Sequence, residues 1–302
     1  MNQNAEKLYK DFSVFLISKG ITDLESFRNA SPEEMNSLFK EFMDMQVGWQ
    51  DEDTDEMDAY DYLDMADKAK KPDEKCLYAR LALEMEPENL EAEIILANYG
   101  THSELEKLRA LEDTVDHGRS ITDRMGLENG EYWRYVPARP YMQARKELMR
   151  QLIKMSMFHK ALDIGLASLE LNPQDNQGVR YDVMWLYLAL EDDRNALKLY
   201  KQYREEDSQL ILGLCMIAFR LDKLEDAKRW LNKLMHVNHE AENFILNYSK
   251  SKINNLLDMV RRNGDYQLGS QELAVALDEG AFAMNNLRIF IDWAKDEISR
   301  TF

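Results

Sequence analysis

The sequence predicts an all-α fold, built as a solenoid of antiparallel helical hairpins. Glycine and proline together fill 18 of the 302 positions, which is too few for the many turns of a sheet protein. Apolar residues recur along most of the chain at the three- and four-residue spacing of amphipathic helices. Similar helix pairs also recur after roughly thirty residues, the length of one helical hairpin repeat.

Composition and charge exclude several classes of protein. The chain has 56 acidic and 38 basic residues, a formal net charge of -18, which disfavours a surface that neutralises nucleic-acid phosphates or anionic lipids. The chain has no continuous apolar stretch long enough for a membrane span and no export signal at its start. Cys76 and Cys215 lie too far apart in sequence to indicate a disulfide scaffold. We therefore expect a cytoplasmic protein that binds neither nucleic acid nor membrane.

The first 48 residues are expected to form a small N-terminal helical unit. Apolar residues from Leu8 to Leu16 follow one stripe of a first helix. A second helix is expected to begin after Ser31, whose hydroxyl can accept hydrogen bonds from the first free amides, and to run to about Met45. The expected domains are this unit at residues 1–48, an acidic linker at 49–62, and a helical repeat domain with a C-terminal cap at 63–302.

Paired helices are expected to follow the linker. Helices at residues 57–70 and 73–85 flank Pro72, and helices at 89–97 and 103–125 come next. The loop that follows carries Trp133, Tyr135 and Tyr141. This aromatic segment is interpreted either as a capping layer or as a binding rim.

Three alanines mark the main repeat. Ala161, Ala196 and Ala227 each open the second helix of a hairpin, at separations of 35 and 31 residues. This period belongs to tetratricopeptide repeats, in which a small residue lets the two helices of a hairpin approach closely. We therefore expect three hairpins of a right-handed α-solenoid. Met149 and Met184 stand where the repeat favours a small residue, so the repeats are degenerate.

The end of the chain is expected to close the solenoid. Helices at about residues 241–261 and 270–297 complete the sequence, and the second is rich in apolar residues. A long apolar terminal helix is typical of the cap that covers the last repeat.

Four phrases of the sequence resemble a known family. They are RPYMQAR (Arg139–Arg145), LNPQDNQGVRY (Leu171–Tyr181), HEAENFILN (His239–Asn247) and ALDEGAFAMNNL (Ala276–Leu287). They are similar to bacterial tetratricopeptide-repeat proteins related to the suppressor-of-tumorigenicity-seven family. The resemblance implies an all-helical interaction scaffold with no known catalytic residues. The phrase VNHEA lacks the proline expected after the last hairpin, and residues 1–48 lie outside the resemblance.

Sequence motifs for catalysis and for cofactors are not found. The chain has neither a glycine-rich phosphate loop nor a nucleophile elbow. The acidic run after Asp51 begins like a calcium loop, but Glu56 and Tyr62 occupy the positions that need glycine and a bidentate carboxylate. His236 and His239 have no evident third ligand. We expect no catalytic residue, metal or cofactor, and the protein is not expected to be an enzyme.

Scarce positive charge indicates the candidate partner site. The first helix of each hairpin lines the inner face of a tetratricopeptide array, and basic residues at its entrance would lead to aromatic and aliphatic ones. Such a groove suits an extended peptide or a helix with an acidic end. The candidate partner-binding residues are Arg139, Tyr141, Lys146, Arg150, Arg180, Tyr181, Trp185, Met216 and Phe219. In the alternative interpretation, Trp185, Met216 and Phe219 are core residues covered by the terminal helices.

The sequence thus predicts a non-catalytic scaffold or adaptor that binds a protein or peptide in the inner groove of its repeats. The alternative is a regulatory protein in which the repeat array senses a peptide or partner and controls the N-terminal unit. The sequence names neither the partner nor the oligomeric state.

Overall fold

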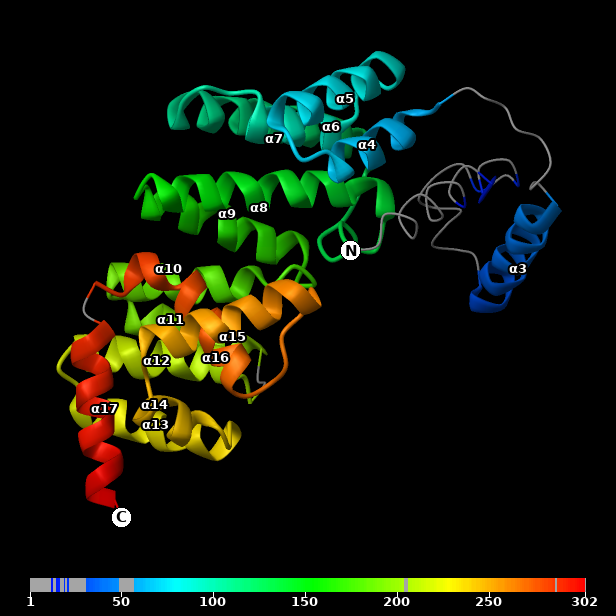
Figure 1. The fold of residues 1–302 in the computed structure, drawn as a ribbon. Helices are drawn as coiled ribbons and strands as arrows, with labels where there is room; N and C mark the ends of the chain where they lie inside the picture. The colour runs from blue at the N-terminus through cyan, green and yellow to red at the C-terminus, as the bar shows by residue number, and fades with distance from the viewer. Residues whose placement is uncertain are drawn as a thin grey trace. The chain divides into compact units, whose positions relative to one another are not determined.

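The computed structural model describes residues 12, 15, 16, 19, 21, 31–48, 57–203, 206–285 and 287–301 (Figure 1). These residues form helices and connecting turns, with no strand among them, which confirms the predicted all-α class. The chain forms two compact units: unit 1 holds residues 1–155 and 167–176, and unit 2 holds residues 156–166 and 177–302. Within each unit, helices pack mainly on their sequence neighbours, as in an α-solenoid. The handedness and the tetratricopeptide assignment stay predictions.

Unit 1 contains α3 (Pro32–Gly48), α4 (Ala59–Lys68), α5 (Pro72–Met85), α6 (Leu90–Tyr99), α7 (Glu104–Met125), η1 (Val136–Ala138) and α8 (Arg139–Lys154). Helix α9 (Phe158–Leu171) has residues in both units. Unit 2 contains α10 (Val179–Leu190), α11 (Asp193–Tyr203), α12 (Ser208–Arg220), α13 (Leu224–Val237), α14 (Ala241–Leu246), α15 (Lys250–Asn263), α16 (Ser270–Glu279), η2 (Ala281–Ala283) and α17 (Leu287–Thr301).

The start of α3 follows its sequence signal. Ser31 Oγ accepts a hydrogen bond from Glu34 N at 3.1 Å, and the Glu34 carboxylate accepts one from Ser31 N at 3.0 Å. Phe12, Phe15 and Leu16 are buried in one cluster with Phe42 of α3. Most of the first expected helix lies outside the described residues. The boundary expected at residue 48 coincides with the end of α3, whereas α4 already begins inside the expected linker.

Small residues bring α4, α5 and α6 close together. Ala66, Ala79, Ala82 and Ala92 have no accessible surface, and Ala59 is almost as fully buried. Alanine at a helix crossing lets the two backbones approach with little loss of helix propensity. Helices α4 and α5 therefore pack as a hairpin, and α6 packs on α5.

The three alanines that mark the repeat are fully buried: Ala161, Ala196 and Ala227. In unit 2, α10 packs on α11 and α12 packs on α13. At the second contact, Cys215 Sγ of α12 donates a hydrogen bond to the Ala227 carbonyl at 3.3 Å. The small residue at position 227 therefore lies where α12 and α13 of one hairpin meet, as the spacing predicts.

Met184 of α10 is larger than the residue that the repeat pattern favours. At this contact the small residue is Gly213 of the neighbouring helix α12. A Cβ atom built on Gly213 of α12 would lie 2.4 Å from Met184 Cγ of α10. The methionine side chain therefore fills the space that a side chain at position 213 would take. The pairing keeps α10 and α12 in contact despite the large residue.

The C-terminal segment is more divided than the sequence predicts. The helix expected at 241–261 is two helices, α14 and α15, and Ser249 Oγ caps the second by accepting from Lys252 N. The helix expected at 270–297 is also two, α16 and α17, separated by η2. Gly280 follows the last residue of α16, and a Cβ atom at this position would lie 2.6 Å from the Trp185 ring. Helix α16 packs on α12, and η2 packs on α10.

The contact between Gly213 and Met184 should appear as energetic coupling. Gly213→Ala is expected to lower the free energy of unfolding by about 1–3 kcal/mol through overpacking. Met184→Ala alone is expected to cost about 2–5 kcal/mol by leaving a cavity. The double variant should lose clearly less than the sum, because the new methyl group enters the vacated space. Urea unfolding of the four proteins measures this coupling, and strict additivity would contradict the contact.

Candidate partner-binding site

The C-terminal segment lies against α10 and α12, where two of the predicted partner-binding residues, Trp185 and Met216, are buried and a third, Phe219, is half-buried. Trp185 is 1% exposed, with Gly280 against its ring. The Phe219 ring lies 5.5 Å from that of Phe290 and 4.9 Å from that of Trp293, both in α17. Met216 is buried beside the same helix. The core interpretation therefore describes Trp185 and Met216, which corrects the expectation that they line an open groove, whereas Phe219 packs on α17 and stays half-buried.

Arg220 connects the C-terminal segment to α10 through hydrogen bonds to two backbone carbonyls. Its guanidinium donates to the Leu188 carbonyl of α10 at 2.7 Å and also to the Ala283 carbonyl of η2. A cavity of about 220 Å³ remains beside Arg220, between α10, α12 and the start of α17. Hydrogen bonds from one cation to carbonyls of α10 and η2 connect the C-terminal segment to the array.

Arg180 and Tyr181 join the start of α10 to the start of α12. The Arg180 guanidinium lies 4.4 Å from the Tyr181 ring centroid and donates to the Tyr181 hydroxyl at 2.7 Å. That hydroxyl donates to Asp207 Oδ2 at 2.7 Å, while Asp207 Oδ1 caps α12. Burial, and the charge of Asp207, raise the pKa of Tyr181. Both half-buried residues thus have a structural role between α10 and α12, and their part in partner binding stays a prediction.

A second polar layer surrounds the start of α12. Asn238 Nδ2 donates to the Gly269 carbonyl at 3.2 Å and to Glu272 Oε2 at 3.4 Å. Gln209 Nε2 donates to the Tyr266 hydroxyl at 3.1 Å. Burial raises the pKa of the Glu272 carboxyl. These contacts hold the turn before α16 against α12 and α13.

The predicted site residues of unit 1 divide into two kinds. Arg139 Nε donates to the Trp133 carbonyl at 2.9 Å, and its guanidinium lies over the Trp133 ring. Tyr141 is buried and accepts from Arg145 at 3.1 Å. Arg139 therefore connects α8 to the aromatic loop, and the Tyr141 ring lies 6.1 Å from that of Tyr132 in the same loop. Lys146 is half-buried and Arg150 is exposed on α8. Four of the nine predicted residues belong to unit 1 and five to unit 2.

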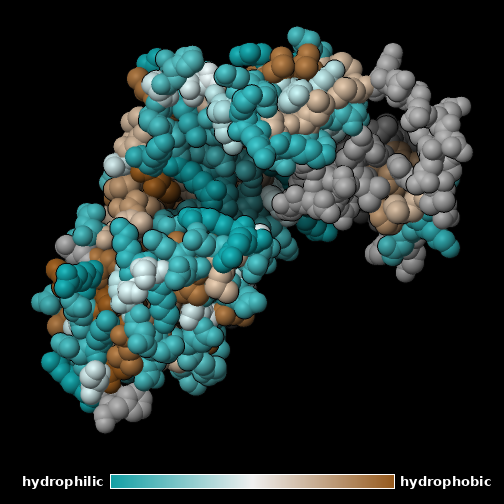
Figure 2. Space-filling model, viewed as in Figure 1, coloured by the Kyte–Doolittle hydropathy of each residue, from teal (hydrophilic) through white to brown (hydrophobic). Residues whose placement is uncertain are grey.

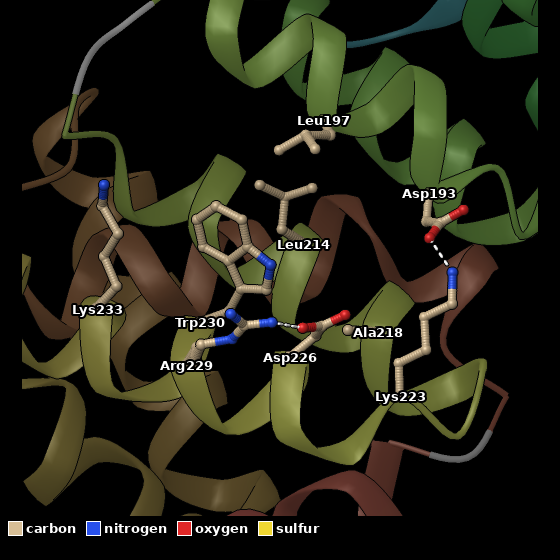
Figure 3. Close-up of a pocket in the computed structure, with 9 residues that line it drawn as sticks. All are labelled: Asp193, Leu197, Leu214, Ala218, Lys223, Asp226, Arg229, Trp230 and Lys233. Atoms are coloured by element: carbon tan, nitrogen blue, oxygen red, sulfur yellow. Dashed lines mark hydrogen bonds and ion pairs between the residues drawn. The ribbon is translucent and has the colours of Figure 1, made fainter.

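A groove that the sequence analysis did not predict lies among α11, α12 and α13 (Figure 3). Its volume is about 490 Å³. Leu214 and Ala218 of α12 form the floor, Leu197 comes from α11, and Trp230 comes from α13. Figure 3 shows the Trp230 indole beside Leu214, with charged side chains to either side. We call this the α11–α13 groove, lined by Asp193, Leu197, Leu214, Ala218, Lys223, Asp226, Arg229, Trp230 and Lys233.

The rim of the α11–α13 groove carries three cations. Lys223 forms an ion pair with Asp193, and Arg229 forms one with Asp226. Lys233 lies over the Tyr200 ring at 5.3 Å. The Tyr200 ring in turn meets Trp230 edge to face at 5.4 Å. The groove therefore combines an apolar centre with positive charge that is partly neutralised.

The sequence contains a pattern that is consistent with this groove. On α13, Asp226, Trp230 and Lys233 follow helical spacing and share one face. The surface in view is largely hydrophilic in Figure 2, and apolar side chains gather in small patches over helices of unit 2 near α17.

Other kinds of site find no support in the described part of the chain. No group of three or more His, Cys, Asp or Glu side chains among these residues is placed to hold a metal ion. No described helix is both long and apolar enough to cross a membrane. Cys76 and Cys215 are free, and burial raises the pKa of both thiols. No protein-family model matches the chain, and no curated protein matches it.

The Tyr181 hydroxyl should contribute measurably to stability. Tyr181→Phe removes the group that connects Arg180 to Asp207 and leaves both charges less well satisfied. We expect the free energy of unfolding to fall by about 1–3 kcal/mol. Tyr200→Phe, which keeps the edge-to-face ring contact with Trp230, should change it by less than about 0.5 kcal/mol. Equal effects of the two variants in urea unfolding would contradict the network.

Glu272 should give a pH-dependent loss of stability. Because its folded-state pKa is raised, its contribution is present at low pH and is lost as the pH rises above the unfolded-state value. Glu272→Gln stays neutral, so its stability relative to wild type should improve between about pH 4 and about pH 7.

Glu240 provides a control of opposite sign. Hydrogen bonds from Ser270 lower the pKa of the Glu240 carboxyl, so Glu240→Gln should cost more stability at about pH 7 than at about pH 4. Chemical unfolding of each variant at both pH values measures the two trends. Parallel trends for Glu272→Gln and Glu240→Gln would show that the Glu272 assignment is wrong.

Proposed function

We propose that the protein is a non-catalytic adaptor of the tetratricopeptide type that binds an extended segment of a protein or peptide partner in the α11–α13 groove. The observation that supports this most directly is the groove itself, whose apolar centre is open to solvent and has a charged rim. Its volume of about 490 Å³ lies within the range of ligand-binding clefts. A flat or fully polar surface would give no comparable anchor for a side chain.

The shape of the groove favours a chain segment over a compact small molecule. Lys223, the residue that precedes α13, and Lys233 of α13 mark its two ends, ten residues apart, which corresponds to about 15 Å along a helix axis. The two walls are the second helices of successive hairpins, α11 and α13, and the groove runs between them over α12. An extended peptide of four or five residues would fill this length.

The proposal moves the binding surface away from the inner face on which the sequence analysis placed it. The α10 and α12 faces that carry Trp185 and Phe219 are occupied by the C-terminal helices. The family assignment and a cytoplasmic location remain part of the proposal. They are supported by the repeat spacing of the three alanines and by two free thiols.

Selection from a random peptide library displayed on phage tests the proposal. The wild-type protein should enrich related peptides, and Leu197→Gln should weaken their binding by about tenfold because it makes the apolar wall polar. Leu268→Gln is a matched control, since Leu268 is 82% exposed in the same unit and lies outside the groove. Circular dichroism and thermal unfolding confirm that both variants fold. Failure to enrich any peptide, or equal binding by Leu197→Gln, would overturn the proposal.

A further inference from the structure

Resting on the proposed function, we infer that the occupant of the α11–α13 groove is an acidic peptide segment that carries one bulky apolar side chain between two carboxylates. The inference concerns the chemical class of the partner. It depends on the charge of the two walls, on the exposure of the rim cations and on the distance between them.

The two helices that form the walls carry a net positive charge on a strongly acidic chain, and the lining itself has three cations and two carboxylates. Residues 193–203 and 223–237 together contain seven Lys or Arg and three Asp or Glu, a net charge of +4 against -18 for the whole chain. One of these cations, Lys228, is paired with Glu297 of α17 at 2.9 Å. Lys223, Arg229 and Lys233 lie on the groove. An acidic partner is attracted to these two helices and repelled by much of the remaining surface. The charge distribution therefore favours acidic partners and directs them to this groove.

The cations on the rim are available to an incoming carboxylate. The Lys223 side chain is 46% exposed and the Arg229 side chain 78% exposed, and their pairs with Asp193 and Asp226 lie in solvent. Exposed ion pairs of this kind contribute little and exchange partners readily. Lys233 has no carboxylate in ion-pair contact within the described part of the chain and lies over the Tyr200 ring instead. A peptide carboxylate can therefore bind without breaking a buried interaction.

The spacing of the groove defines the pattern of the peptide. In an extended chain, alternate side chains face the same way and residues advance about 3.3 Å each. Two carboxylates four residues apart therefore span about 13 Å, close to the separation of Lys223 and Lys233 along α13. The side chain midway between them faces Leu197, Leu214 and Trp230. The structure thus favours an acidic residue, an apolar residue and a second acidic residue at alternate positions.

Fluorescence polarisation with synthetic peptides tests this pattern. The parent probe carries Glu-Ser-Leu-Ser-Glu between Gly-Ser flanks and a fluorescein label. We expect it to bind, and we expect replacement of both Glu by Lys, or of Leu by Ser, to weaken binding about tenfold or more. Raising the salt concentration from about 0.05 to about 0.5 M should weaken the parent several-fold, because exposed charges are screened. Equal binding of the Glu and Lys peptides would overturn the inference.

Reversing the charge of a groove residue on the protein provides a second test of the inference. Lys233→Glu should weaken the Glu peptide about tenfold and should strengthen binding of the Lys peptide. Lys250→Glu changes the net charge equally, in the same unit, at an exposed residue of α15 outside the groove, and should leave both affinities unchanged. Equal behaviour of these two variants would place the charge effect elsewhere and overturn the inference.

The two proposals fail in different ways. If the library yields peptides that depend on Leu197 but are neutral or basic, the acidic class is wrong while peptide binding stands. If no peptide depends on Leu197, the function itself is overturned. Binding of a single-stranded oligonucleotide that is lost in Lys233→Glu, without binding of the Glu peptide, would also overturn the acidic-peptide inference in favour of a nucleic acid.

Discussion

Helix α12 imposes the main constraint on unit 2, because its residues from Ser208 to Ala218 are buried on every side. A helix that is apolar around its whole circumference must be enclosed, and one hairpin partner covers only part of it. Helices α10, α11, α13 and α16 all pack on α12. The C-terminal helices are therefore part of the core of this unit. Where α11 and α13 leave one side of α12 open, the surface forms the α11–α13 groove.

Polar contacts at the start of α12 set the register of the helices that surround it. Burying charged and hydroxyl groups is costly unless each finds a partner, so the network around Asp207 is tolerated only in one arrangement of α10 and α12. A cation next to an aromatic ring, as in the phrase NQGVRY, is also typical of binding motifs, so the sequence pattern alone does not distinguish the two roles. Arg180 and Tyr181 recognise another part of the same chain.

Sequence alone predicts the helical class, the three repeat alanines and the Ser31 cap, because these depend on local spacing and on backbone groups left free at helix ends. It does not predict what lies over an apolar face. Trp185 and Phe219 are apolar on a helix in either interpretation, and only the path of the C-terminal segment decides that they are covered. The sequence does not predict the α11–α13 groove for the same reason, because the separation of the helices that form its walls depends on tertiary packing.

The two cysteines lie in different units, Cys76 in α5 of unit 1 and Cys215 in α12 of unit 2. Burial raises the pKa of each thiol, and a buried thiol reacts slowly with alkylating reagents. Alkylation of either sulfur therefore requires its surroundings to open. Mass spectrometry of the two tryptic peptides would then give the alkylation rate of each cysteine, and with it the rate at which the surroundings of that cysteine open in each unit.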